Sequence, residues 1–382
     1  MRLNRLVNSL HPGAPKGLIP CASDWVRQRN VDAAQLRRPQ AAAWETTVFP
    51  AEANFNLLQS HFEPTPGEEF SRVRWTTTPA ASLFYLQGCR VLGAEAAVIA
   101  PDNRVFADFT LPPAEHWQDH SCFMRRRIPR IQPLKGWYAT ITWPESRFFF
   151  HWMIEALPRM AVLGEFSKIL DGLFIPGPLQ KFQRESLRAL GIDDAKLIPV
   201  DVGSHFAPEH LFVPRAFSMY NPPRWLHAWF KQAYLLPAGD GGARSGPGRR
   251  IYVSRADAPA RKVANEAEIV EMLGRYGFES VTLSGHAFDA QARIFNQADI
   301  IVGANGAGLS HIVFCRAGTT VIEALPARWM APCFMTLALS AGCHYRPLVA
   351  QESDPRGASD PQRADILVPL RELEDLVRAA LS

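Results

Sequence analysis

Residues 299–314 read DIIVGANGAGLSHIVF, and this stretch decides the fold expected of the second half of the chain. The apolar run predicts a buried strand that ends at Gly303, and Gly306, Ala307 and Gly308 predict a tight turn that begins a helix. Small residues let a phosphate approach the backbone there, and free N–H groups at a helix start favour its negative charge. The stretch therefore predicts a phosphate-binding strand–turn–helix unit.

The next predicted strand, TTVIEAL at 319–325, places Glu323 where a carboxylate can accept hydrogen bonds from ribose hydroxyls. A glycine turn alone is better explained by close packing of strand and helix, but Glu323 favours a nucleotide site. The glycines follow the order G-x-x-G-x-G and not G-x-G-x-x-G, and the unit is not at the first turn of its domain. A dinucleotide-binding dehydrogenase is therefore the less favoured alternative.

Residues 251–269, IYVSRADAPARKVANEAEI, supply candidate phosphate-binding cations. Arg255 follows a predicted strand, at the edge where open α/β sheets bind ligands, and Arg261 and Lys262 follow in the loop. Arg255 with Arg261 or Lys262 would neutralise a diphosphate. Asn265 is predicted to cap the next helix, with Glu268 completing a capping box.

Strands and helices alternate regularly in this half of the chain. Strands are expected at 250–255, 279–283, 299–303 and 319–325, and helices at 265–276, 288–296, 306–314 and 370–381. Such βα repeats need a parallel sheet covered on both faces, so residues 248–382 are predicted to form a Rossmann-like domain. The Gly- and Pro-rich residues 237–248 are predicted to be the linker, with the domain boundary near residue 245.

The first half predicts a second α/β domain over residues 81–240, after an irregular lead-in at 1–80. A strand at 90–100, a turn at 101–103 and a strand at 104–109 predict a hairpin. Further strands are expected at 137–143, 172–176, 196–200 and 210–214, and helices at 148–163, 179–190 and 225–236.

The helix predicted at 148–163 carries His151, Glu155 and Arg159, at i, i+4 and i+8 on one stripe. An imidazole is suited to act as a general base near neutral pH, and Glu155 would fix its tautomer or supply the carboxylate base itself. A buried structural histidine and a surface salt bridge between Glu155 and Arg159 explain the same residues equally well.

The 382 residues are 47% hydrophobic and 20% charged with a net charge of +4, which fits a globular protein and disfavours a nucleic-acid binder. The six cysteines show no metal-ligand spacing, so we expect reduced thiols, a cytoplasmic location and no bound metal. No apolar run is long enough to span a membrane, and residues 1–17 lack the apolar core of a secretory signal. The arginines within 125–130 leave open a peripheral contact with the inner face of a membrane, and a homo-oligomer is also left open.

Three segments, taken in order, resemble glycosyltransferase family 61, which includes bacterial capsular-polysaccharide proteins, plant xylosyltransferases and eukaryotic O-linked N-acetylglucosaminyltransferases. They are HWMIEALPRM at 151–160, IYVSRADAPARKVANEAEI at 251–269 with GFESV at 277–281, and VGANGAGLSHIVFCRAGTTVIEALP at 302–326. The resemblance covers about residues 85–330 and is strongest after residue 250.

This resemblance implies an α/β protein with two Rossmann-like domains facing across a cleft, the GT-B type. It also implies an inverting, metal-independent transferase with the donor in the C-terminal domain and the acceptor facing the N-terminal one. We expect His151 or Glu155 to be the base. The residues expected to bind substrate are Arg159, Arg255, Arg261, Lys262, Asn305, Gly306, Ala307, Gly308, Leu309 and Glu323.

The chain departs from the family pattern at Asn305, where the family usually has His, and at His311, where it usually has Asn. A carboxamide cannot carry a proton charge. The departure therefore indicates either an altered choice of donor or an exchange in which His311 replaces the missing imidazole.

The sequence thus predicts a hexosyl- or pentosyltransferase that needs no cofactor. It would move a sugar from a nucleotide-sugar donor to a hydroxyl of a glycan or polysaccharide, in the synthesis of a surface or capsular polysaccharide. The alternative is a non-catalytic nucleotide- or glycan-binding subunit of a polysaccharide assembly complex.

Overall fold

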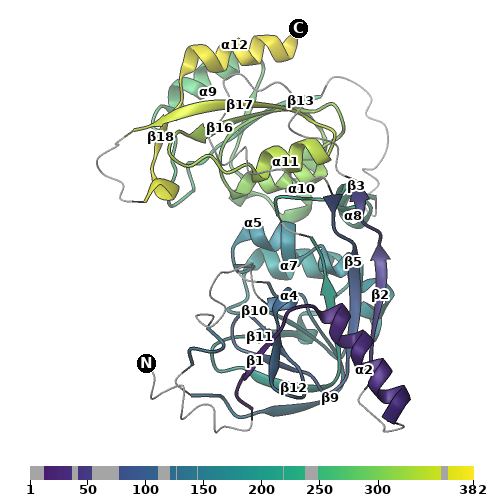
Figure 1. The fold of residues 1–382 in the computed structure, drawn as a ribbon. Helices are drawn as coiled ribbons and strands as arrows, with labels where there is room; N and C mark the ends of the chain where they lie inside the picture. Colours follow the sequence, from purple (N-terminus) through teal and green to yellow (C-terminus); the bar gives the residue numbers. More distant parts are fainter. Residues whose placement is uncertain are drawn as a thin grey trace. The chain divides into compact units, whose positions relative to one another are not determined.

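A computed structural model describes residues 13–36, 42–53, 77–110, 121–125, 127–143, 145–217, 219–236, 248–353 and 360–382 (Figure 1). The chain packs into two units, one of residues 1–51 and 79–217 and the other of residues 52–78 and 218–382. Both units combine a sheet with helices, so the expected α/β class is confirmed. The arrangement of two Rossmann-like domains across a cleft stays a prediction.

The N-terminal unit is built on a ten-stranded sheet of order β1-β8-β7-β6-β12-β9-β10-β11, in which β5 pairs with β12 and β2 with β5. Strands β12, β9, β10 and β11 are parallel, whereas the pairs among β6, β7 and β8 are antiparallel. The sheet is therefore mixed, unlike the all-parallel sheet expected of a Rossmann-like domain. The strands are β1 (Gly17–Ile19), β2 (Ala43–Phe49), β5 (Ala81–Leu86), β6 (Arg90–Leu92), β7 (Ala97–Ile99), β8 (Arg104–Phe106), β9 (Gln132–Thr140), β10 (Gly172–Pro176), β11 (Leu197–Val200) and β12 (His205–Arg215).

Two expectations for this unit are corrected. The described part of the lead-in is not irregular, because helix α2 (Ala22–Leu36) buries Ala22 and Val26 in the core and sets Trp25 edge-on to Phe106 at 5.1 Å. The strand expected at 90–100 is divided into β6 and β7 by a turn in which Gly93 has a φ of 79°. The helices are α2 (Ala22–Leu36), α4 (Ala107–Thr110), α5 (Phe149–His151), the π-helix η3 (Trp152–Ala156), α6 (Arg159–Leu163), α7 (Lys181–Ala189) and the 3-10 helices η4 (Gly164–Ile169) and η5 (Asp194–Lys196).

The C-terminal unit is built on a six-stranded sheet of order β14-β13-β15-β16-β17-β18. The first five strands are mutually parallel, as the regular βα alternation predicts, and β18 is antiparallel. The strands are β13 (Arg249–Val253), β14 (Glu279–Val281), β15 (Ala298–Ala304), β16 (Thr320–Pro326), β17 (His344–Glu352) and β18 (Ile366–Leu367), with a separate pair of β3 (Glu52–Ala53) and β4 (Thr77–Thr78).

Helices cover both faces of this sheet (Figure 1). Helices α9 (Glu266–Gly274) and α12 (Leu370–Leu381) pack on one face against Val302 and Ile322, and α10 (Phe288–Asn296) and α11 (Cys333–Ser340) lie on the other. The remaining helices are α8 (Arg224–Tyr234) and the 3-10 helices η7 (Leu283–Gly285), η8 (Ala307–Phe314) and η9 (Pro361–Arg363).

Helix α8 belongs to the C-terminal unit, because Phe230 packs edge-on against Phe314 of η8 at 5.3 Å. The division by contacts therefore falls after Phe217. The linker and boundary expected at 237–248 lie almost entirely outside the described residues.

Candidate functional site

The carboxyl ends of β13 and β15 lie level with each other, since Val253 is paired with Gly303 and the strands are parallel. Arg255 and Gly306 each follow their strand within a few residues, so both leave the same edge of the sheet. The structure brings Arg255, Arg261 and Asn305 to this edge together with the Gly306 turn. This is the edge at which open α/β sheets bind ligands.

The guanidinium of Arg255 lies directly over Gly306. A Cβ at position 306 would come within 1.6 Å of Arg255 Nη1, while the φ of 176° is open to any residue, so a larger residue here would displace the guanidinium. Arg255 is oriented by donating from Nε to the carbonyl of Arg261 and from Nη2 to that of Ala260, each at 2.7 Å. Burial lowers the pKa of Arg255 to about 10, so the group is still a cation at neutral pH.

Glu266 fixes the backbone from which Arg255 projects. Its Oε1 accepts from the Arg255 amide and from the Tyr252 hydroxyl, both at 3.0 Å. The predicted capping box is wrong, because Asn265 makes no side-chain cap and instead bonds the amide and carbonyl of Val368. Asn265 therefore ties the start of α9 to the segment that leads into α12.

Arg261 is held by a side chain from the glycine turn and by an aromatic ring. Its Nη1 donates to Asn305 Oδ1 at 3.0 Å, and its guanidinium lies 5.0 Å from the ring centroid of Trp329. Burial lowers the pKa of Arg261 as well. Lys262 is exposed, and its backbone amide donates to Asp365 Oδ1 at 2.7 Å. The turn is thus bordered by two half-buried guanidinium groups, whereas the contact of Lys262 is made by its backbone.

Glu323 is fully buried, which corrects the expected contact with a ribose. Its carboxylate accepts from Asn305 Nδ2 at 2.7 Å and from the Tyr345 hydroxyl at 2.6 Å. Burial raises its pKa to about 7, against the opposing effect of those two donors and of the charge on Arg261. Glu323 is buried because it lies on β16, a strand with neighbouring strands on both sides and helices over both faces of the sheet. Glu323 therefore holds Asn305 and Tyr345 by hydrogen bonds and does not face solvent.

The helix expected after the glycines is the 3-10 helix η8. The first N–H groups of a helix have no intrahelical acceptor, and here they belong to the half-buried Ala307 and Gly308. Leu309 differs, since its side chain is buried and its amide donates to the Gly306 carbonyl at 2.9 Å. The Leu309 side chain is therefore enclosed by protein, whereas Ala307 and Gly308 are half-buried, and their roles in binding substrate stay predictions.

His311 does not replace an imidazole at position 305. It is buried beside Phe295 at a ring distance of 5.2 Å, and its Nδ1 lies 3.0 Å from the Gly308 carbonyl. Burial lowers its pKa to about 4. The imidazole ring belongs to the core under η8. Asn305 is therefore the residue that contacts Arg261 at the ligand-binding edge of the sheet.

In the N-terminal unit, His151 and Glu155 form the contact that their spacing predicts. His151 Nδ1 lies 2.7 Å from Glu155 Oε2, and Glu155 is buried. The segment after His151 is a π-helix, a form that occurs mostly as single turns and is frequent at functional sites. Sequence reasoning missed Glu145, whose Oε2 lies 3.0 Å from His151 Nε2. Nothing in the periodicity could have found it, since it lies in the turn before the helix.

Arg159 lies on the same helical segment but turns inward. It donates from Nε to the Glu155 carbonyl and from Nη1 to the Pro214 carbonyl, each at 3.0 Å, and stacks 4.7 Å from the ring centroid of Trp143. Its burial lowers its pKa to about 10. These contacts correct its expected role in binding substrate, because the guanidinium ties the helix to β12 and is enclosed by protein.

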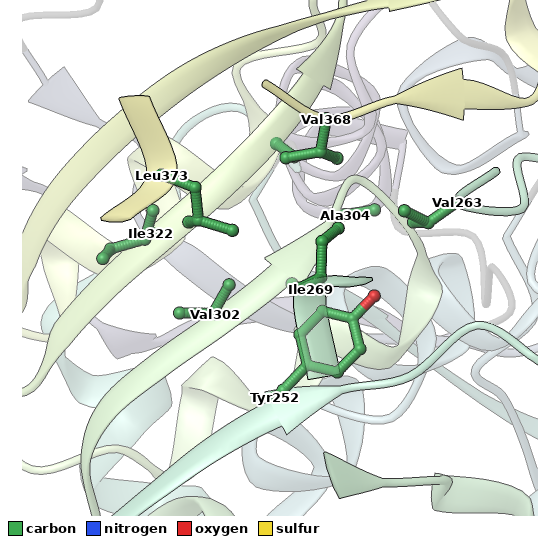
Figure 2. Close-up of a pocket in the computed structure, with 10 residues that line it drawn as sticks. Tyr252, Val263, Ile269, Val302, Ala304, Ile322, Val368 and Leu373 are labelled. Carbon is green, nitrogen blue, oxygen red and sulfur yellow. The ribbon is translucent and has the colours of Figure 1, made fainter. Parts of the chain in front are cut away.

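Two pockets lie elsewhere in the C-terminal unit. One, between the sheet and α9, is apolar and has a volume of only about 10 Å³, about the space of one water molecule (Figure 2). The other holds about 450 Å³ and is lined in part by Lys231, Asn296 and Arg316. Neither is lined by a predicted site residue.

Three further observations concern metals, thiols and membranes. Within the described ranges, no group of three or more His, Cys, Asp or Glu is arranged to hold a metal ion. All six cysteines are free thiols. None of the helices in the described part of the chain has the length and apolar character needed to cross a membrane.

Comparison with known proteins finds one matching family model. A family model described as Glycosyltransferase 61 matches residues 149–322. The matched segment contains His151 and Glu155 in one unit and Arg255, Arg261 and the Gly306 turn in the other. No curated protein matches the chain. Residues 149–322 therefore match glycosyltransferase family 61, and this match indicates a glycosyltransferase.

Proposed function

We propose that the protein transfers a sugar from a nucleotide-sugar donor to a hydroxyl of a glycan or polysaccharide, without a metal ion and with inversion at the anomeric carbon. The reaction would take place in the cytoplasm during synthesis of a surface or capsular polysaccharide. The sugar is a hexose or a pentose.

The observation that carries this proposal is the guanidinium of Arg255 over Gly306, beside the first amides of η8. A cation and free N–H groups at a strand–turn–helix junction are the partners that a diphosphate needs. Arg261, held by Asn305 and Trp329, supplies a second fixed positive charge. Preorganised cations of this kind stabilise the charge that develops on a leaving nucleoside diphosphate.

The base in this proposal is His151. When Nδ1–H donates to the buried carboxylate of Glu155, Nε2 is the nitrogen left to take a proton. In the reaction, the acceptor hydroxyl loses its proton to Nε2 and its oxygen bonds to the anomeric carbon. The bond from that carbon to the diphosphate breaks, and the nucleoside diphosphate leaves with the electron pair. A single displacement inverts the configuration.

The test is transfer by the purified full chain with a panel of nucleotide sugars and glycan acceptors, with and without EDTA. We expect transfer from one donor class, unchanged by EDTA, with a product whose anomeric configuration in NMR is opposite to that of the donor. Retained configuration would contradict the single displacement. Loss of turnover in EDTA, restored by a divalent cation, would contradict the metal-independent part of the proposal.

The donor site is tested with Arg255→Ala, because this guanidinium carries the proposal. Loss of one charge-assisted contact costs about 1.5–3 kcal/mol, which weakens donor binding by roughly 10- to 100-fold. Arg249→Ala is the matched control, since Arg249 begins β13, the strand that leads to Arg255, and its pairing with Glu279 is at the surface. Equal donor affinity in the two variants would remove the assignment of this edge.

A further inference from the structure

Both ring nitrogens of His151 face carboxylate oxygens. Nδ1 lies 2.7 Å from Glu155 Oε2, and Nε2 lies 3.0 Å from Glu145 Oε2. The two carboxylates differ in exposure, since the Glu155 side chain is 7% exposed and that of Glu145 is 63% exposed. Glu155 is thus a fixed partner, and Glu145 is one that can move into solvent.

The number of protons decides what this arrangement can do. A neutral imidazole has one N–H donor and one lone pair, so it can satisfy only one carboxylate. Two hydrogen bonds across Glu155, His151 and Glu145 require two protons shared among the three groups. In that state Nε2 has no free lone pair, and His151 cannot accept a proton from a substrate while Glu145 is in place.

The backbone holds Glu145 in this position. Glu145 has a φ of 65°, a left-handed conformation that is uncommon for residues other than glycine. Its carbonyl accepts from the Phe148 amide at 2.8 Å, which closes the turn ahead of α5. Unfavourable backbone conformations of this kind cluster at functional sites. An uncharged ring also packs on the imidazole, since Phe150 meets it edge-on at 5.2 Å.

We propose that Glu145 is a displaceable occupant of the catalytic nitrogen. When the acceptor hydroxyl replaces it, the proton held between Nε2 and Glu145 leaves with Glu145 and passes to solvent, so that Nε2 regains the lone pair that takes up the acceptor proton. This inference rests on the proposed function, because it assumes that His151 is the base. The contact between Glu145 and Nε2 affects hydrolysis of the donor by water. With Glu145 on Nε2, a water molecule cannot pass its proton to the ring, bond to the anomeric carbon and release the nucleoside diphosphate. Glu145 therefore limits hydrolysis of the donor when no acceptor is bound.

The decisive variant is Glu145→Gly, because glycine adopts a φ of 65° freely and removes only the side chain. Glu165→Gln is the matched control, since Glu165 is an exposed glutamate of the same unit that pairs with Lys168. The measurement is release of nucleoside diphosphate without acceptor, divided by transfer with acceptor. We expect this ratio to rise several-fold in Glu145→Gly and to stay at the wild-type value in Glu165→Gln. An unchanged or lower ratio in Glu145→Gly would overturn the proposal.

Glu145→Gln removes the negative charge at position 145 but keeps a side chain that can occupy Nε2, because the glutamine amide can donate a hydrogen bond to a neutral Nε2. The ratio should stay near the wild-type value in this variant. A ratio as high as that of Glu145→Gly would contradict occupancy as the cause.

A second measurement does not depend on turnover. Long-range ¹H–¹⁵N NMR of histidine-labelled protein distinguishes a doubly protonated ring from a neutral one, and the signals of His151 are those missing in His151→Gln. We expect the Nε2 signal of His151 to differ between the wild type and Glu145→Gly, because the substitution removes the hydrogen-bond partner of that nitrogen. The same Nε2 signal in both proteins would overturn the proposed occupancy. If transfer is absent but the ring changes as expected, the failure lies in the proposed reaction and not in the contact.

Discussion

Asn305 donates from Nδ2 to Glu323 Oε1 over 2.7 Å, while its Oδ1 accepts from Arg261 Nη1 over 3.0 Å. A carboxamide has one donating and one accepting end, so the buried carboxylate determines which end faces Arg261. The Tyr345 hydroxyl holds the same carboxylate from the other side. A chain of hydrogen bonds thus runs from the core of the sheet to a guanidinium at its ligand-binding edge.

The first prediction concerns the pH dependence of stability due to Glu323. Burial raises its pKa from 4.5 to about 7, so the folded state keeps a proton in this range that the unfolded state releases. The contribution is fully present below pH 4.5 and is lost as the pH rises through about 7. We expect the unfolding free energy of the wild type, relative to Glu323→Gln, to fall by about 3 kcal/mol over this window. Urea unfolding at a series of pH values measures it, and a difference independent of pH would contradict the assignment.

The second prediction uses Gly306→Ala to displace Arg255 without removing it. The added Cβ would lie 1.6 Å from Nη1, and the extended backbone accepts alanine, so the flexible guanidinium must move. We expect at least a roughly tenfold loss of affinity for inorganic pyrophosphate in calorimetric titration, equivalent to about 1.4 kcal/mol. Gly274→Ala is the control, because a Cβ there meets nothing within 4 Å. If both variants bind pyrophosphate like the wild type, Arg255 does not serve the diphosphate.

A third prediction concerns the role of His151 as a base. Removing a general base slows turnover by about 10²- to 10⁴-fold, so His151→Gln should show this loss in kcat. Donor affinity should stay unchanged, because the donor site proposed here lies in the other unit. The exposed His286→Gln variant should keep full turnover. A loss confined to KM would instead indicate a role in binding.

A fourth prediction concerns acid stability and His227. Its Nε2 lies 2.7 Å from Ser340 Oγ, and burial lowers its pKa from 6.5 to about 3. Its contribution is fully present above pH 6.5 and is lost as the pH falls towards 3, because the unfolded state takes up the proton first. Relative to His227→Gln, the wild type should lose about 3 kcal/mol of unfolding free energy between pH 6.5 and pH 4. Denaturant titrations at these pH values test this, and a constant difference would refute it.

Several features could be predicted from the sequence because they depend on short stretches of chain. His151 and Glu155 are one helical turn apart, and their contact survives the local widening into a π-helix. The end of β15 at the Gly306 turn follows from an apolar run that meets small residues. Parallel pairing then brings Arg255 to the same edge, since β13 and β15 are neighbours in register.

Other features depend on segments far apart in sequence. Asn265 stands where a helix cap is expected, yet its side chain bonds Val368, a residue more than a hundred positions away. Strand β17 contains Pro347 and mixed polar residues, so its pattern predicted no strand, although it pairs with β16 along its length. The Tyr345 hydroxyl that it brings to Glu323 could not be anticipated for the same reason.

The sequence by itself determined the α/β class, the strand–turn–helix unit at Gly306 and the helical pairing of His151 with Glu155. These rest on periodicity, glycine content and one-turn spacing, which are local properties. Only the tertiary structure decided that Glu323, Leu309 and Arg159 are enclosed by protein, and that Glu145 meets Nε2. Burial and hydrogen-bond partners depend on what the rest of the fold packs around a side chain, and a residue's own neighbours in sequence do not specify it.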